Sequence, residues 1–202
     1  MDTLKIDQTA TASVIRRKPD TLSPKGWFRV EHYRNGVKIG EYNTPNAITD
    51  QGRQKMLDVM FDSATHITAW YMGIVDSTSY SALAAGDSYA QIGGSNGWHE
   101  YTNYTDDANG NSAVTRPGWG AGASSVLSHV VSTTNATSAV FDITSGGSGT
   151  VKGLFIVGGT NAQTKSDNTA SGNVLWSSAL FAGGDVTVLN GDQLKVTYTI
   201  SV

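Results

Sequence analysis

The chain has 202 residues, of which 39% are hydrophobic and 15% charged, with a formal net charge of −3. This length suits one all-β domain with an arm, and 23 glycines favour short strands and tight turns over a helical bundle or a disordered chain. The absence of cysteine excludes disulfides and thiolate metal sites, and no apolar run reaches the ~18 residues of a membrane span. The first twelve residues do not resemble a signal peptide, so we expect synthesis and assembly in the cytosol.

Charge is unevenly distributed along the chain. Residues 1–55 contain 10 of the 14 Lys and Arg residues and 6 acidic residues, whereas residues 56–202 contain 4 basic and 11 acidic residues. A basic start and an acidic body indicate that the two parts face different surroundings. The alternative is a soluble arm beside an ordinary acidic surface.

Residues 1–25 have neither helical nor strand periodicity. The basic cluster Arg16-Arg17-Lys18 precedes Pro19, and a second proline follows at Pro24. Proline interrupts helices, so we expect an extended N-terminal arm over residues 1–25, followed by a β-sandwich domain over residues 26–202. Such an arm either packs on a neighbouring subunit as an added strand or is a loose terminus.

A hairpin is predicted directly after the arm. Residues 27–33 and 37–42 alternate in polarity on either side of Asn35-Gly36, and both turn residues tolerate positive φ. In the first strand, the residues expected on one face are Phe28, Val30 and His32.

One short helix is expected over residues 50–61. Thr49 or Asp50 can cap its first turn. Four apolar residues follow at the spacing of a single helical stripe, namely Met56, Leu57, Met60 and Phe61. We expect this stripe to face the core, so that the helix closes one open end of the sandwich.

The remainder of the chain predicts short strands separated by glycine-rich turns. The predicted strands cover residues 67–75, 98–104, 125–131, 138–143, 150–157, 173–181, 186–189 and 193–202. The first of them is apolar enough to be buried on both faces. This spacing predicts an all-β fold, a β-sandwich or jelly roll with one short helix and an extended N-terminal arm. Two long loops, residues 77–97 and 105–124, are expected to be functional or to form interfaces.

Residues suited to metal binding are scattered. None of the histidines, His32, His66, His99 and His129, has another within four positions, so we expect surface or polar-core residues rather than ligands. The segment 106–111 departs from the EF-hand pattern, because Thr105 and Arg116 would occupy the positions that require acidic residues. It is either an Asx-rich turn or an irregular cation site.

Motifs for catalysis are also lacking in the sequence. It contains no nucleophile elbow and no phosphate-binding loop, so we predict no catalytic, cofactor-binding or metal-binding residues and no enzyme. A pI of about 5.7 is low for a nucleic-acid-binding domain. The basic cluster of the arm is therefore expected to contact an acidic protein neighbour rather than DNA, and no membrane partner is expected.

Seven short motifs occur in order between residues 70 and 199. They are WYMGI (70–74), LAAGD (83–87), WHEY (98–101), RPGW (116–119), KGLFI (152–156), LWSSALF (175–181) and GDQLKVTYT (191–199). Taken in this order, across residues 26–202, they resemble one group of tailed-bacteriophage virion structural proteins. The resemblance implies a virion component that is made in the cytoplasm of the host bacterium.

The leading hypothesis is a capsid decoration, or cement, protein on the capsid exterior. Its partner would be the major capsid protein, whose subunits the arm and long loops would bridge, and the chain itself would form a dimer or trimer. The candidate interface residues are Arg16, Arg17, Lys18, Trp98, Arg116 and Trp119. Arg and Trp are enriched in interface hot spots. For the last two residues there is an alternative, in which Trp119 covers the sandwich core and Arg116 is solvated.

A second hypothesis is a tail or fibre component that binds a host-surface glycan. In that case the aromatic residues stacking on sugar rings would be Trp98, Tyr101, Tyr104 and Trp119. The absence of long repeats or a coiled coil argues against a fibre shaft. A virion glycan hydrolase ranks below both hypotheses.

Overall fold

The computed structural model describes residues 24–78, 80–93, 97–106, 114–120, 130–132, 138–144, 146–166, 168–169 and 172–201. The first strand begins at Lys25, so the expected arm lies outside the described residues except for its last two positions. Arg16, Arg17 and Lys18 lie outside them as well. So do His129 and most of the segment 106–111.

The described part of the chain is mostly β-structure, as expected for an all-β fold. The strands are β1 (Lys25–Arg34), β2 (Val37–Ile48), β3 (Trp70–Asp76), β4 (Glu100–Tyr101), β5 (Tyr104–Asp106), β6 (Val130–Ser132), β7 (Ala139–Ile143), β8 (Gly149–Gly158), β9 (Val174–Leu180), β10 (Val186–Val188) and β11 (Asp192–Ser201). The helix α1 (Asp50–Phe61) and the 3₁₀ turn η1 (Tyr89–Gln91) complete the elements. No helix in these described ranges is long and apolar enough to cross a membrane.

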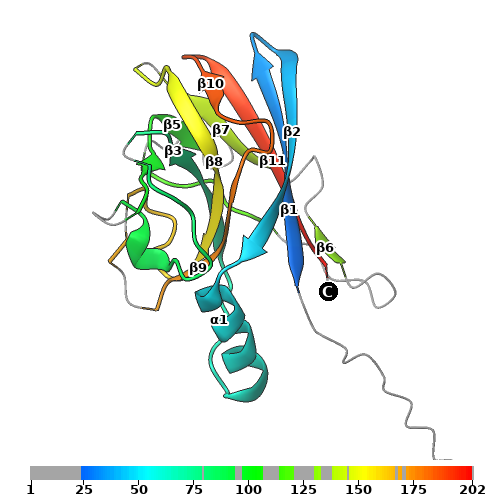
Figure 1. Ribbon diagram of the computed structural model, residues 1–202, viewed down its shortest axis with the longest axis vertical. Coiled ribbons are helices and arrows are strands. Elements are labelled where there is room, and N and C mark those ends of the chain that lie inside the picture. Colours follow the sequence, from blue (N-terminus) through cyan, green and yellow to red (C-terminus); the bar gives the residue numbers. More distant parts are fainter. Residues whose placement is uncertain are drawn as a thin grey trace, which may run out of the picture.

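The strands form one antiparallel sheet that folds over a central core (Figure 1). Its order is β4-β3-β8-β9-β2-β1-β11-β7-β5, with β10 beside β8 and β6 beside β11. β2 joins the two halves of the sheet, because it pairs with β1 as far as Asn46 and with β9 at Ala47 and Ile48. The outermost strands, β4 and β5, follow each other in the chain, so the sheet is nearly closed.

The predicted β1–β2 hairpin is present. Asn35 and Gly36 have φ angles of 50° and 75°, as a tight hairpin turn with two positive φ values requires. Phe28, Val30 and His32 are buried on one face of β1, as predicted. β2 extends beyond the predicted residue 42, because its ladder with β1 continues to the Gly26–Asn46 pair.

Two predicted strands differ from the observed ones, and residues 125–129 of the strand expected over residues 125–131 lie outside the described residues. The strand expected over residues 98–104 is divided into β4 and β5, because the chain turns at Thr102, whose carbonyl accepts a hydrogen bond of 2.9 Å from the Tyr104 amide. The strand expected from residue 67 begins only at Trp70.

Two hydrophobic clusters hold the fold together. The larger lies inside the folded sheet and includes Phe28, Phe141, Leu154 and Tyr198. The smaller includes Phe155 and Trp98, and lies on the other face of β8, because successive strand residues point in opposite directions. Residues 72–75 of β3 are all buried between the two clusters, which confirms the prediction of a strand covered on both faces.

The start of β11 is held by a buried carboxylate. Asp192 Oδ2 lies 2.8 Å from His32 Nε2, and Asp192 accepts hydrogen bonds of 2.7 and 2.8 Å from Arg34 and one of 2.9 Å from the Leu189 amide. Burial alone would raise the pKa of Asp192, but the hydrogen bonds from Arg34, Leu189 and His32 hold it well below its ordinary value. Through His32 and Arg34, the ionised carboxylate of Asp192 therefore connects the start of β11 to β1.

We expect the Asp192→Asn variant to lose about 2–3 kcal/mol of unfolding free energy at pH 7. Because the pKa of Asp192 is lower in the folded state, its contribution is present above the unfolded pKa of ~3.9 and declines as pH falls toward the folded value. The difference in unfolding free energy between wild type and Asp192→Asn should therefore become smaller from pH 5 to pH 3, as measured in urea titrations. Asp185→Asn, at an exposed carboxylate, serves as the control. A difference in unfolding free energy that stays constant from pH 5 to pH 3 would contradict the lowered pKa of Asp192 in the folded state.

Candidate functional site

Two motifs of the sequence meet in a buried ion pair. Arg116 Nε and Nη2 donate to the two oxygens of Glu100 at 2.9 and 2.8 Å, and both side chains are almost completely buried. Arg116 Nη1 donates to the Ala162 carbonyl at 2.7 Å. Desolvation lowers the pKa of Arg116, but the Glu100 charge more than offsets it, so the pKa lies above its ordinary value. The Arg116 guanidinium therefore stays protonated.

The remaining lone pairs of Glu100 are also used. Tyr104 Oη donates to Glu100 Oε1 at 2.9 Å, and the Ser166 amide donates to Oε2 at 2.7 Å. Burial, reinforced by the Glu100 charge, raises the pKa of Tyr104 well above its ordinary value, so the phenol remains a donor. The network joins β4, β5 and the segments around Arg116 and Ser166, which identifies it as a structural clasp.

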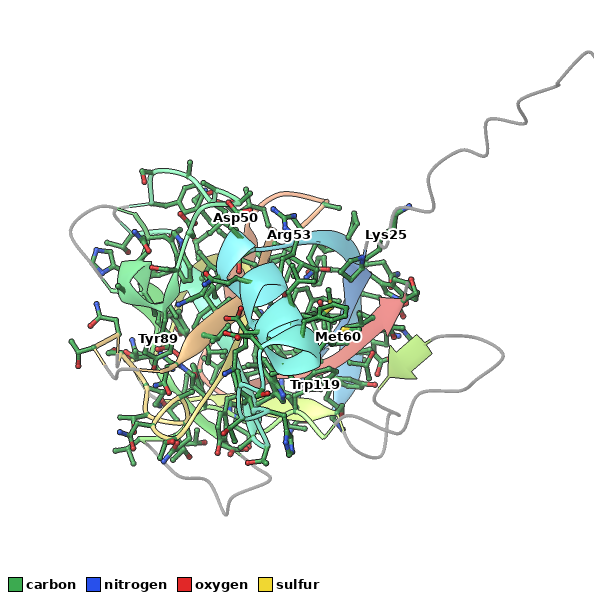
Figure 2. The ribbon with its side chains drawn as sticks, turned by 90° about the horizontal axis from the view of Figure 1, so that it is seen from below. Lys25, Asp50, Arg53, Met60, Tyr89 and Trp119 are labelled. Carbon is green, nitrogen blue, oxygen red and sulfur yellow. The ribbon has the colours of Figure 1, made fainter. Side chains whose placement is uncertain are left out.

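The structure corrects the predicted interface roles of Trp98, Arg116 and Trp119, because it buries all three within the chain. Trp98 packs on Phe155 at a centroid distance of 5.2 Å. Trp119 meets Tyr198 edge to face at 5.3 Å, so it covers the core as the alternative held, whereas Arg116 is not solvated. In the described parts of the two long loops, Tyr89, Ile92 and Trp119 are buried within the chain. Figure 2 labels Trp119 among the elements of the body.

The aromatic platform expected for glycan binding is also absent at the named positions. Tyr101, Tyr104, Trp98 and Trp119 are 4%, 1%, 0% and 7% exposed, so a sugar ring cannot stack on them. Tyr101 donates its hydroxyl hydrogen to the Gly147 carbonyl. Burial, and to a smaller extent the negative charge of Asp76, raise the pKa of Tyr101 to about 12. These side chains serve the fold.

Helix α1 provides a candidate surface away from these buried residues. Its bounds and its N-cap, Thr49, agree with the prediction. Thr49 Oγ1 accepts a hydrogen bond of 3.0 Å from the Gly52 amide and donates to the Leu175 carbonyl of β9. The Thr49 amide donates to the Trp176 carbonyl at 2.9 Å, and the Asp50 amide donates to the Ala85 carbonyl at 2.8 Å. The first turn of the helix is thus fixed to the body.

Close packing reinforces this anchor. A Cβ atom at Gly52 would lie 2.6 Å from the Trp176 carbonyl oxygen, so only glycine permits this approach of α1 to β9. Gln51 Oε1 accepts hydrogen bonds from the amides of Tyr89 and Leu175 at 2.9 and 2.8 Å. From this anchor the helix projects away from the sheet at one end of the molecule (Figure 1).

The Thr49→Ala variant tests the anchor. It removes the cap of Gly52 and the donor to Leu175, so we expect a loss of about 1–2 kcal/mol in the free energy of unfolding. Thr68→Ala, at an exposed position after the helix, should change stability by less than about 0.5 kcal/mol. Equal stability of the two variants in urea titrations would show that the cap does not hold α1.

The apolar stripe of α1 does not face the core as predicted. Only Met56 packs against the main core, whereas Leu57, Met60 and Phe61 are 47%, 57% and 78% exposed. These three lie at i, i+3 and i+4 and therefore share one side of the helix. The inward side is already occupied by the close approach of Gly52 and by Met56, so the other apolar side chains remain in solvent.

A groove lies beside this exposed side. It has a volume of about 220 Å³ and is lined by Lys55, Met56, Val59, Met60, His66, Ile67, Trp70 and Trp176. We use the name α1 surface for this groove together with Leu57 and Phe61. A more polar groove of about 510 Å³ adjoins it and shares Lys55, His66 and Ile67. Figure 2 looks onto this end of the molecule, with α1 in front of the sheet.

The C-terminal end of α1 is acidic. Asp58 lies in the last turn, Asp62 is the C-cap residue, and the last turn contains no basic residue. The partial negative charge of a helix C-terminus adds to these carboxylates. The carboxylates of Asp58 and Asp62 therefore lie beside the α1 surface, whose groove is itself lined by Lys55.

The outer face of β1 and β2 differs from the acidic end of α1, because its basic and acidic side chains pair with one another. Arg29 donates to Glu31 at 2.9 Å and to Glu41 at 3.0 Å, and Lys38 lies 2.9 Å from Glu31. These exposed pairs neutralise one another and leave little net field for a charged partner.

Within the described residues, no group of three or more His, Asp or Glu side chains is placed to hold a metal ion. No protein-family model, curated protein or solved structure matches the chain. The α1 surface was not predicted from the sequence, although five apolar residues between Met56 and Phe61 are more than one helical stripe can hold.

Proposed function

We propose that this protein is a structural component of a tailed-bacteriophage virion, and specifically a capsid decoration protein. It would bind the capsid exterior beside the major capsid protein and bridge its subunits. The ordered motifs between residues 70 and 199 support the virion setting. The α1 surface is the observation that carries the assembly role.

The apolar side of α1, formed by Leu57, Met60 and Phe61, is exposed to solvent. Soluble proteins that act alone rarely present a contiguous apolar patch next to a groove, and such patches mark contacts with other proteins. An apolar helix side with i, i+3 and i+4 anchors is a common recognition element. Because Thr49, Gln51 and Gly52 fix the base of α1, the apolar side is held in position before binding.

Preorganisation matters for a protein that stabilises a shell. A fixed surface loses little conformational freedom on binding, so more of the interaction free energy appears as affinity. Repeated over many symmetric positions, and with the chain itself a dimer or trimer, modest contacts sum to substantial resistance against internal DNA pressure.

The test adds the purified protein to capsids of the encoding phage that were assembled without it. After sedimentation of the capsids, we expect saturable co-sedimentation at a fixed ratio to the major capsid protein. If the protein stays in the supernatant at every concentration, the decoration role is wrong. Serum albumin added to the same capsids controls for trapping.

A further inference from the structure

We infer that the α1 surface is the docking site for residues 14–18 of a second copy of this chain, so that two copies exchange their N-terminal segments. This inference rests on the proposed function in one respect. If the α1 surface is an assembly interface, its occupant comes from another chain. The first partner of this interface is then a second copy of the chain.

Chemical complementarity selects the segment. Residues 14–18 read Val14-Ile15-Arg16-Arg17-Lys18, two β-branched apolar residues followed by three positive charges. The end of α1 offers a complement to both parts, an apolar side at Leu57, Met60 and Phe61 and, beside it, the carboxylates of Asp58 and Asp62. Seating the apolar pair on the helix side brings the basic residues to the acidic end.

Electrostatics favours this seating from both sides. Asp58, Asp62 and the helix C-terminus place negative charge together without a basic residue in the last turn, an arrangement that is unfavourable for an isolated helix. Three positive charges from another chain would relieve it. The basic cluster in turn would find acidic partners in a protein whose body, residues 56–202, has 11 acidic against 4 basic residues.

The position of the chain start makes the exchange possible. β1 begins at the same end of the molecule as α1 (Figures 1 and 2), and Lys25 is labelled there with Met60. Residues 19–24 separate the segment from Lys25, and an extended connection of six residues spans roughly 20 Å. This reach is comparable to the length of a 12-residue helix, about 18 Å.

A mutual exchange also explains why the occupant is another copy. Two copies that donate segments to each other cover both α1 surfaces and form a closed pair with one repeated interface. Docking of the segment on its own helix would cover the apolar side without creating any contact between chains.

The absence of cysteine allows a direct test by disulfide crosslinking. An Ile15→Cys chain that carries a size tag is mixed with an untagged Met60→Cys chain and oxidised with copper phenanthroline. We expect a mixed product, resolved on a non-reducing gel, at least ten times more abundant than with Val37→Cys in place of Met60→Cys. Val37 is the matched control, since it is exposed and apolar and lies at the far end of the β1–β2 hairpin.

A charge exchange provides the second readout. Changing Arg16, Arg17 and Lys18 to Glu should lower the mixed product at least ten-fold, and combining it with Asp58→Lys and Asp62→Lys on the Met60→Cys chain should restore much of it. Circular dichroism verifies that each variant is folded. A mixed product no greater than in the Val37→Cys control overturns the inference. So does a crosslink that forms only within one chain carrying both cysteines.

The failure of this inference can be told from the failure of the proposed function. If crosslinking fails but lysine at positions 60 and 61 still abolishes capsid co-sedimentation, α1 contacts the capsid itself and only the inference is wrong. If crosslinking fails and the lysine variant also binds capsids as wild type does, both the inference and the assembly role of the α1 surface are wrong.

Discussion

The Arg116→Met variant is expected to lose about 3–5 kcal/mol of unfolding free energy, because it leaves the buried Glu100 carboxylate without its counter-charge. A loss of this size is a large fraction of the ~5–15 kcal/mol that stabilises a typical domain. Urea unfolding followed by tryptophan fluorescence measures it. Arg29→Met, which removes an arginine whose side chain is 38% exposed, should leave the urea midpoint nearly unchanged.

A double variant separates the ion pair from simple packing. Glu100→Gln removes the buried charge and retains one oxygen, which can accept from either Tyr104 or the Ser166 amide, the two groups that now donate to different oxygens of Glu100. Combined with Arg116→Met, it should be clearly more stable than the sum of the two single losses predicts. Additive losses, or a loss below about 1 kcal/mol for Arg116→Met alone, would contradict the view of this network as a charged clasp.

The double change Met60→Lys and Phe61→Lys is expected to weaken capsid binding about 100-fold, while the stability of the chain stays nearly unchanged. The two apolar side chains, at about 1.5 kcal/mol each, account for this factor, because their loss breaks the exchanged pair of copies that binds the capsid. Both side chains are mostly in solvent, and lysine is favourable near a helix C-terminus, so the fold should not suffer. Co-sedimentation with capsids and urea titration measure the two quantities.

The control for this variant lies at the opposite end of the molecule. Val37→Lys and Ile39→Lys replace two apolar residues that are 64% and 49% exposed at the tip of the β1–β2 hairpin (Figure 1). This pair adds the same charge and should leave capsid binding within about two-fold of wild type. Equal weakening by both double variants would indicate a general charge effect rather than an interface at α1.

The sequence predicted much of the backbone, because local patterns determine it. Asn35-Gly36 set the hairpin, Thr49 set the start of α1, and alternation in residues 27–33 set the buried face of β1. Each of these features depends on residues that are close together in the chain. The divided strand at β4 and β5 was missed, since its turn at Thr102 carries no glycine or proline.

The placement of side chains from the long loops could not be predicted. Arg116 is buried only because Glu100, which lies 16 positions earlier, and the Ala162 carbonyl accept its hydrogen bonds. Trp119 is covered because Tyr198 of the last strand lies against it. Such contacts depend on how the sheet folds over, whereas the sequence shows only a charged residue and an aromatic residue in a loop.

The orientation of α1 was mispredicted for a related reason. The spacing of its apolar residues fits a core-facing stripe, but the close contact of Gly52 with Trp176 determines which side faces inward. That contact leaves Leu57, Met60 and Phe61 outside. The excess of apolar residues in the second half of the helix was the available signal for an unpartnered side.

The most direct test of the proposed virion role is the copy number of this protein per particle, measured by quantitative mass spectrometry of purified virions against the major capsid protein. A decoration protein should be present at a count comparable with that of the capsid protein. A count of a few copies per particle would contradict the shell-wide role. Absence from purified particles would contradict the virion assignment as a whole.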